Sequence, residues 1–131
     1  MKLLLDTNAY TGLMRGHESV VTAVSEAEQI LMSAIVVGEF LFGFRNSNRL
    51  EKNRQQLESF LREPFVDFVP VGKSTCNRFG QVATQLRRKG KPIPQNDVWI
   101  AAHALETGAD LIRADTHFKA VNGLSLIGID D

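Results

Sequence analysis

The sequence predicts an α/β domain in which a mainly parallel five-stranded sheet carries helices on both faces. Short apolar runs, of the length expected for strands buried on both sides, alternate along the chain with longer segments of helical periodicity. Capping residues, glycines and prolines stand between these segments. A chain of 131 residues with 44% hydrophobic and 23% charged residues is typical of one globular domain, so we expect a single domain over residues 1–131.

The predicted strands are the shortest apolar segments. The first, "KLLL", is followed at once by Asp6, Thr7 and Asn8, which are residue types that begin helices. The third, "FVDFVPV", comes directly after Pro64, which stops the preceding helix. The five strands are predicted at residues 2–5, 30–33, 65–71, 110–113 and 124–129.

The predicted helices have apolar side chains on one face and recognisable ends. Gly90 and Gly108 stand at the ends of the last two long helices, where glycine commonly terminates a helix. Asn96 or Asp97 is expected to cap the start of the last one. The helices are predicted at residues 8–14, 17–29, 34–44, 47–63, 73–90 and 96–108, with a short helical segment at 114–118.

One carboxylate interrupts an otherwise uncharged segment. Between Ile30 and Phe44 the only ionisable side chain is Glu39, and no polar face surrounds it in the predicted helix. Burial of a lone carboxylate is unfavourable unless a positive or hydrogen-bonding group meets it. The candidate partners are Arg45, an arginine from another helix, and a metal ion, and the residues alone leave this choice open.

Three aspartates are predicted at the same edge of the sheet as Glu39. Asp6 follows the first strand, Asp115 follows the fourth within two residues, and Asp97 begins the helix that leads into the fourth. Sites in such sheets form at the carboxyl ends of the strands. Four carboxylates repel one another unless a cation joins them or some stay protonated, and oxygen ligands alone suit Mg²⁺ or Mn²⁺. Helix capping is the alternative for each aspartate, but it does not account for Glu39.

Four segments resemble, in order and spacing, the motif blocks of PIN-domain ribonucleases, and most closely those of the VapC-type toxins of bacterial toxin–antitoxin pairs. They are "LLLDTNAY", "SAIVVGEFLFGF", "IPQNDVWIAAHAL" and "LIRADTHF". The resemblance extends from Leu3 to Leu126 and implies a PIN-like (Rossmann-like) three-layer sandwich.

This resemblance implies a metal-dependent endoribonuclease that uses Mg²⁺ or Mn²⁺ and acts as the toxin of a type II toxin–antitoxin pair. The catalytic and metal-binding acids of the family correspond to Asp6, Glu39, Asp97 and Asp115, with Asp6 and Asp97 as the firmest metal ligands. Asn8 is expected to hydrogen-bond to a ligand, with capping of the first helix as the alternative. The alternative function is a catalytically inactive PIN-like interaction module whose acids only cap helices.

The chain departs from the family pattern at Arg113. The family commonly has Thr or Ser at this position, two residues before its last aspartate. An arginine there is expected to pair with a carboxylate or to contact a phosphate of the substrate. The other substrate-binding candidates form a basic cluster around the end of the 73–90 helix, where the helix dipole also favours cations. This cluster consists of Arg87, Arg88, Lys89 and Lys91.

The histidines and the tryptophan are assigned structural roles. His117 is expected to pack beside Phe118, with substrate contact as the alternative. His103 is expected to face a neighbouring element. Trp99 is expected to belong to the core rather than to a surface on which bases stack.

The resemblance also implies partners for the chain. They are an RNA substrate, with tRNA or ribosomal RNA as candidates, a cognate VapB-type antitoxin, and a second copy of the chain in a homodimer. Phe40, Leu41, Phe42 and Phe44 point around one helix and cannot all face one core, so some of them should face a partner.

Charge and cysteine content restrict the class further. The formal net charge is zero, which argues against a protein that coats DNA through a bulk positive field. The single cysteine, Cys76, cannot form an internal disulfide and fits a reducing compartment. The apolar start "MKLLLDTN" is too short for a signal peptide or a membrane span, so we expect a cytoplasmic protein without membrane contact.

Overall fold

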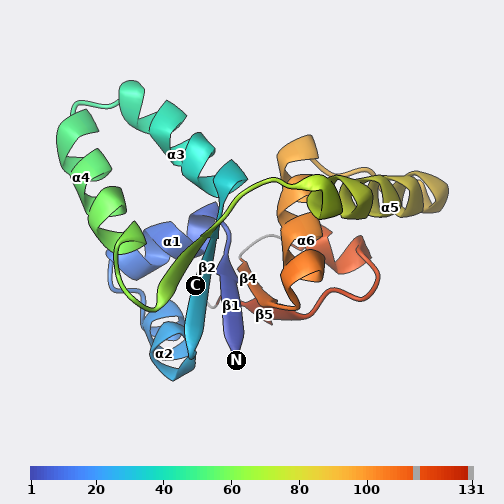
Figure 1. The fold of residues 1–131 in the computed structure, drawn as a ribbon, viewed down its shortest axis with the longest axis horizontal. Coiled ribbons are helices and arrows are strands. Elements are labelled where there is room, and N and C mark those ends of the chain that lie inside the picture. Colours follow the sequence, from blue (N-terminus) through green and yellow to red (C-terminus); the bar gives the residue numbers. More distant parts are fainter. Residues whose placement is uncertain (114–115, 130–131) are drawn as a thin grey trace.

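A computed structural model of the protein describes residues 1–113 and 116–129. Its centre is a five-stranded sheet in the order β3-β2-β1-β4-β5, and every neighbouring pair of strands is parallel (Figure 1). This sheet confirms the predicted fold class. The strands are β1 (Lys2–Leu5), β2 (Gln29–Ser33), β3 (Val66–Val69), β4 (Asp110–Arg113) and β5 (Leu126–Gly128).

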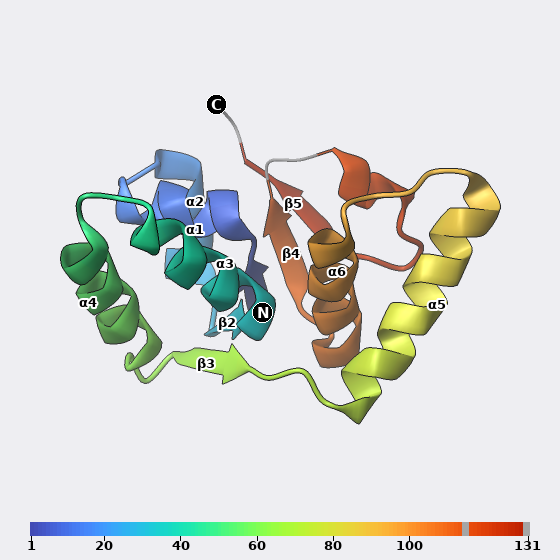
Figure 2. The same ribbon diagram turned by 90° about the horizontal axis from the view of Figure 1, so that it is seen from above.

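Helices cover both faces of the sheet and complete a three-layer arrangement. In both ribbon views α1 and α2 lie on one side of the strands, and α5 and α6 lie on the other (Figures 1 and 2). Within the described part of the chain, none of the helices combines the length and apolar character that a membrane crossing requires. The helices are α1 (Thr7–Met14), α2 (Glu18–Glu26), α3 (Ala34–Arg45), α4 (Leu50–Leu61), α5 (Lys73–Lys89) and α6 (Gln95–Thr107), with a short 3₁₀ helix η1 (His117–Ala120).

Several elements are shorter than the sequence predicts. The fourth helix covers Leu50–Leu61 instead of residues 47–63, and the fifth strand covers Leu126–Gly128 instead of residues 124–129. The third strand stops at Val69, because Pro70 has no N–H with which to continue the ladder. The second helix stops at Glu26 rather than at residue 29. Gln29 instead begins β2, where it pairs with Lys2 of the central strand.

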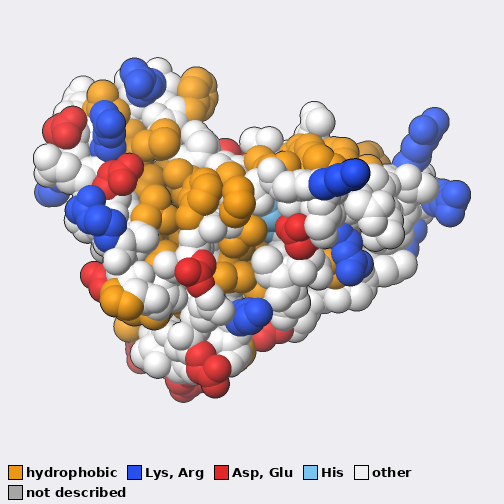
Figure 3. All heavy atoms as spheres, in the orientation of Figure 1, with side chains coloured by type: hydrophobic (Ala, Val, Ile, Leu, Met, Phe, Trp, Pro, Cys, Tyr) orange, Lys and Arg blue, Asp and Glu red, His pale blue; other side chains and the backbone are white. Residues whose placement is uncertain are grey.

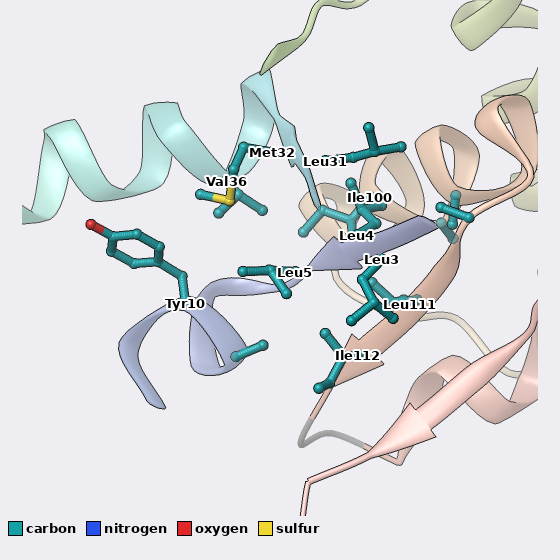
Figure 4. Close-up of a cluster of buried hydrophobic side chains, with 14 of the residues drawn as sticks. Leu3, Leu4, Leu5, Tyr10, Leu31, Met32, Val36, Ile100, Leu111 and Ile112 are labelled. Atoms are coloured by element: carbon teal, nitrogen blue, oxygen red, sulfur yellow. The ribbon is translucent and has the colours of Figure 1, made fainter. Parts of the chain in front are cut away.

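The leucines of β1 form the middle of the core. Leu3, Leu4 and Leu5 have no exposed surface. Successive side chains of a strand point to opposite faces of the sheet, so Leu4 packs towards one layer of helices, whereas Leu3 and Leu5 pack towards the other. Figure 4 shows Leu4 beside Ile100 of α6. Burial of this strand on both faces explains its uninterrupted apolar sequence.

The strand order reverses between β1 and β4. The chain passes from β1 outward to β2 and β3, and then crosses to β4 and β5 on the other side. The register sets Leu5 opposite Ile112, and the N–H of Asp6 donates to the Ile112 carbonyl at 3.2 Å. In sheets of this kind, ligands bind in the crevice at the carboxyl ends of the strands where the order reverses.

Candidate active site

Asp6 lies directly after β1 at this reversal point and is 3% exposed. Its Oδ1 accepts a hydrogen bond from the N–H of Ala9 at 2.7 Å and caps α1, as predicted. A carboxylate has two oxygens, so capping through Oδ1 is compatible with a further role in the site. Asn8 is exposed in the first turn of α1 and does not cap it, so the capping alternative for Asn8 is wrong.

Glu39 lies in the middle of α3 and has a buried oxygen, Oε1, without a hydrogen-bond partner among the described residues. Burial raises the pKa of Glu39, a hydrogen bond from the Asn96 side chain lowers it, and the negative charge of Asp97 raises it. Within the described residues no ion pair joins Glu39 to Arg45 or to another arginine. The alternative of an arginine partner therefore finds no support among the described residues, where Glu39 meets the amide of Asn96 and the charge of Asp97.

Asp97 lies in the first turn of α6 and pairs with His117. The distance from Nε2 of His117 to Oδ2 of Asp97 is 2.6 Å. The ring of His117 also packs against Phe118 at a centroid distance of 5.0 Å, as predicted. The contact with the acid was not expected from the sequence. Neither Asn96 nor Asp97 is the N-cap of α6, which is Pro94, so that expectation is wrong. The helix begins one residue before Asn96, which turns the two side chains towards Glu39 and His117 instead.

Arg113 ends β4 beside Asp6, because Leu5 and Ile112 are register partners and each is followed by one of these two residues. The arginine is 8% exposed, and its Nε is buried without a hydrogen-bond partner among the described residues. The predicted site residue Asp115 lies outside the described residues. The β1–β4 register thus places the backbone of Arg113 beside that of Asp6.

The donor chemistry of these side chains fits a hard divalent cation. Asp6, Glu39 and Asp97 offer only oxygen atoms, and the unpartnered Oε1 of Glu39 is a buried acceptor that a cation would satisfy. The three side chains are not gathered into a ready-made centre, since no group of three or more His, Cys, Asp or Glu in the described ranges is close enough to hold a metal ion.

The profile of the PIN domain matches residues 3–124. The chain belongs to the PIN-domain family. It is similar to Ribonuclease VapC1 of Haemophilus influenzae, with 31% identity over 86% of this chain and 85% of the relative. It is also similar to the tRNA(fMet)-specific endonuclease VapC of Shigella flexneri, with 26% identity over 95% of both chains.

Solved structures agree with this assignment. The PIN domain superposes on a chain in the crystal structure of VapBC2 from Rickettsia felis bound to a DNA fragment from its promoter. The TM-score is 0.87, with 27% identity over 99% of this chain and 100% of the other. The agreement over both full lengths confirms the PIN-like three-layer arrangement expected from the sequence.

The four residues of the basic cluster lie in different places on the surface of this PIN domain. Lys89 donates to the Ala120 carbonyl at 3.0 Å and to Oδ1 of Asn122 at 2.7 Å, and so ties η1 and the segment after it to α5. Lys91 lines a hollow that it shares with His117. Arg87 and Arg88 line two other surface depressions along α5. The four cations are therefore not one continuous surface.

His103 and Trp99 of the PIN domain have structural roles. His103 has no exposed surface, and its ring nitrogens lie 2.8 Å from Ser33 Oγ and 3.1 Å from the Pro70 carbonyl, which confirms that it faces neighbouring elements. Trp99 is half-buried and stacks on Phe79 at a centroid distance of 4.1 Å. Trp99 thus joins α6 to α5 outside the buried hydrophobic core, so the expectation that it belongs to the core is wrong.

Two contacts in this site escaped prediction from the sequence. Asn96 was considered only as a cap, although its position directly before Asp97 was a usable signal for a place in the site. His117 follows the last aspartate motif by two residues, which allowed substrate contact but gave no sign of the pairing with Asp97.

Proposed function

We propose that this chain is the toxin of a type II toxin–antitoxin pair and hydrolyses RNA at the carboxylate site of Asp6, Glu39, Asp97 and Asp115 with Mg²⁺ or Mn²⁺. The observation that carries the proposal is the buried Oε1 of Glu39, which has no hydrogen-bond partner among the described residues and lies within the influence of the Asp97 charge. An acceptor in that position is unfavourable by itself and favourable beside a cation. Relatives of the chain that carry the name ribonuclease support the choice of RNA.

Asp6, Glu39, Asp97 and Asp115 would hold the divalent cation. When bound, such a cation supplies positive charge against the scissile phosphate and makes water a better nucleophile. The side chains of the protein fix the geometry around it. The cap on α1 holds Asp6, and the hydrogen bond from His117 holds Asp97 in one orientation.

Arg113 is proposed to act from within the site. Its guanidinium is buried at the end of β4 beside Asp6, so its positive charge partly offsets the repulsion among the acids. The same charge would also attract a phosphate of the substrate to the carboxyl edge of the sheet. Asn8, two residues after Asp6, is proposed to hydrogen-bond to a ligand of the site from the exposed side.

The substrate is proposed to be a structured RNA, with tRNA as the first candidate and ribosomal RNA as the second. The name of the Shigella flexneri relative, which specifies tRNA(fMet), supports testing an initiator tRNA first.

An antitoxin and a second copy of the chain are the proposed protein partners. Phe42 is 72% exposed on α3, and apolar side chains gather on the same face from α3 towards α6 (Figure 3). Beside them lies a hollow of about 460 Å³ with Tyr10, Phe40 and Phe44 in its lining. Exposed apolar surface of this kind marks a protein–protein contact. The Rickettsia felis chain that this protein resembles was crystallised as a VapBC complex, which supports a VapB-type partner.

The rival function is a catalytically inactive PIN-like interaction module. The absence of a ready-made group of three metal ligands in the described ranges is the observation that favours it. Carboxylate-dependent binding of Mn²⁺ separates the two functions, since acids that only cap helices give the module no reason to bind the ion.

The test uses purified protein free of antitoxin, with an initiator tRNA and ribosomal RNA as substrates. We expect discrete cleavage products with Mn²⁺ or Mg²⁺, and none with EDTA or in the Asp97→Asn variant. Cleavage that persists in excess chelator would overturn the metal-dependent site. Loss of all cleavage together with absence of Mn²⁺ binding in calorimetry would establish the interaction module instead.

A further inference from the structure

A hollow with a volume of about 330 Å³ lies beside the acids, between the α5–α6 connection and η1. Its charged and polar lining consists of Lys89, Lys91, Thr116, His117 and Lys119, and the remaining lining residues are apolar. Among the residues that the structure describes, no Asp or Glu lines it. A concave surface with three ammonium groups and a hydroxyl is suited to a phosphate group, because each can donate hydrogen bonds to the phosphate oxygens.

The hollow is connected to the acids through one side chain. The ring of His117 forms part of its wall, and Nε2 of the same ring lies 2.6 Å from Oδ2 of Asp97. A group bound in the hollow is therefore separated from Asp97 by a single imidazole. This closeness makes the hollow suitable for a neighbouring phosphate of the strand that is cut at the acids.

The wall formed by η1 is held firmly against α5. Lys89 and Nε2 of Gln85 both donate to the carbonyl of Ala120, and Oε1 of Gln85 accepts from the N–H of Asn122. Lys89 is thus occupied in forming the wall. Lys91 and Lys119 are exposed and form no ion pair with any described residue, so their charges are available to a ligand.

An alternative explanation for these lysines is that they are solvated surface residues or are favoured by the helix dipole at the end of α5. The dipole accounts for basic residues in the last turn of α5. It does not account for Lys119, which comes from η1 and converges on the same hollow as Lys91 from the α5–α6 connection. Convergence of cations from separate segments next to the His117–Asp97 contact favours a binding role.

We propose that this hollow binds a backbone phosphate of the RNA strand next to the scissile bond, with Lys91, Lys119 and the Thr116 hydroxyl as its ligands. Phosphate contacts carry no sequence information but fix the register of a strand on the protein. The hollow would therefore set where the RNA chain lies relative to Asp97. This inference rests on the proposed ribonuclease function, and it separates Lys91 and Lys119 from the rest of the basic cluster.

The test compares Lys91→Gln and Lys119→Gln with Lys2→Gln, which removes an exposed lysine at the opposite edge of the sheet. Binding of a fluorescein-labelled initiator tRNA is measured by anisotropy in EDTA, from about 50 to 200 mM salt. We expect each hollow variant to bind several-fold more weakly at the lower salt concentration. The slope of log K against log salt should fall by about 0.7 to 0.9 per lysine, while Lys2→Gln keeps the wild-type slope.

Wild-type slopes in both hollow variants, or the same loss in Lys2→Gln, would overturn the inference. Thermal melts check that the variants are folded. We expect wild-type melting temperatures, because both side chains are exposed and neither forms a hydrogen bond with a described residue. The measurement in EDTA does not depend on cleavage. A protein that binds the tRNA through these lysines but never cuts RNA would therefore refute the proposed function and leave the phosphate site standing.

Discussion

At the scale of single residues, the buried carboxylate of Glu39 lowers the stability of the fold. It combines a buried, unpartnered oxygen with a neighbouring acid, and burial is the main cause of its raised pKa. In the folded protein this group binds a proton more readily than in the unfolded chain. It therefore lowers the stability of the fold as pH rises from the ordinary glutamate pKa of 4.5 through the raised value.

Replacement of Glu39 by Gln keeps the shape and removes the charge. In EDTA at neutral pH the variant should melt at the wild-type temperature or above it, and the difference should vanish near pH 4, where Glu39 is protonated in the wild type too. Cleavage of RNA should fall by roughly 100-fold or more, because a charged group aimed at the reacting centre is lost. A variant that melts much lower in EDTA and still cleaves RNA normally would make Glu39 a structural residue.

Arg113 is the second residue with a local electrostatic role. Its replacement by Thr removes the buried positive charge beside Asp6, so the acids should repel more strongly and the protein should melt lower in EDTA. For the same reason Mn²⁺ should bind more tightly to the variant in calorimetry. Arg62→Thr, at an exposed position after α4, is the matched control. Weaker Mn²⁺ binding by Arg113→Thr would contradict this account.

At the scale of elements, α6 is joined to the rest of the fold by a buried histidine. His103 contacts Ser33, the N-cap of α3, and Pro70, which follows β3. Burial lowers the pKa of His103, while the Pro70 carbonyl and the charge of Glu106 raise it. The neutral ring is favoured in the fold, so its contribution to stability is complete above the ordinary pKa of 6.5 and is lost as pH falls below it.

The variant His103→Gln should lose about 1 to 3 kcal/mol of stability at pH 7, because the buried hydroxyl of Ser33 and the carbonyl of Pro70 lose their partner. The wild type should lose stability between pH 7 and pH 5 and the variant should lose less, so the gap between them should narrow in acid. Urea unfolding at both pH values measures the gap. A gap that stays constant would show that the ring does not titrate in this range.

The exposed side of α3 is an element-scale feature of a different kind. Phe42 is 72% exposed, so Phe42→Asp should leave the melting temperature of the isolated chain nearly unchanged. It should reduce self-association in light scattering or binding to a co-encoded antitoxin, because a charge is placed in an apolar contact. Val21→Asp on α2, where the side chain is 41% exposed, is the control. Equal effects of the two substitutions would remove α3 from the interface.

At the scale of the whole molecule, the strand order brings together residues that are far apart in the chain. The reversal between β1 and β4 places the ends of these strands at one edge. The acids of α3 and α6 lie near enough to each other for the charge of Asp97 to act on Glu39. A cation that binds only this assembled site must stabilise the whole fold, since the unfolded chain lacks the site.

We therefore expect Mn²⁺ to raise the melting temperature of the wild type by roughly 10 °C at concentrations about 100-fold above its dissociation constant. Asp97→Asn should abolish most of this shift, and Asp67→Asn, at an exposed position in β3, should keep it. Differential scanning calorimetry with and without EDTA provides the measurement. The same shift in Asp97→Asn and in the wild type would place the bound ion elsewhere.

The sequence by itself determined the elements of this protein and the identities of most of its site. Apolar runs, capping residues and terminal glycines act within a few residues of their positions, so the strands, the helices and the cap at Asp6 followed from local physics. The lone charge of Glu39 in an apolar helix was also recognisable from the sequence. A carboxylate loses its hydration on burial whichever group later becomes its partner.

Only the tertiary structure decided which polar groups meet. Asp97 and His117 are 20 residues apart, and Ser33 and His103 are 70 apart. The hollow between the α5–α6 connection and η1 likewise needs Lys91 and Lys119 on opposite walls. Such contacts depend on how helices pack at the end of the sheet. The residues next to a side chain in the sequence do not indicate which element it will contact.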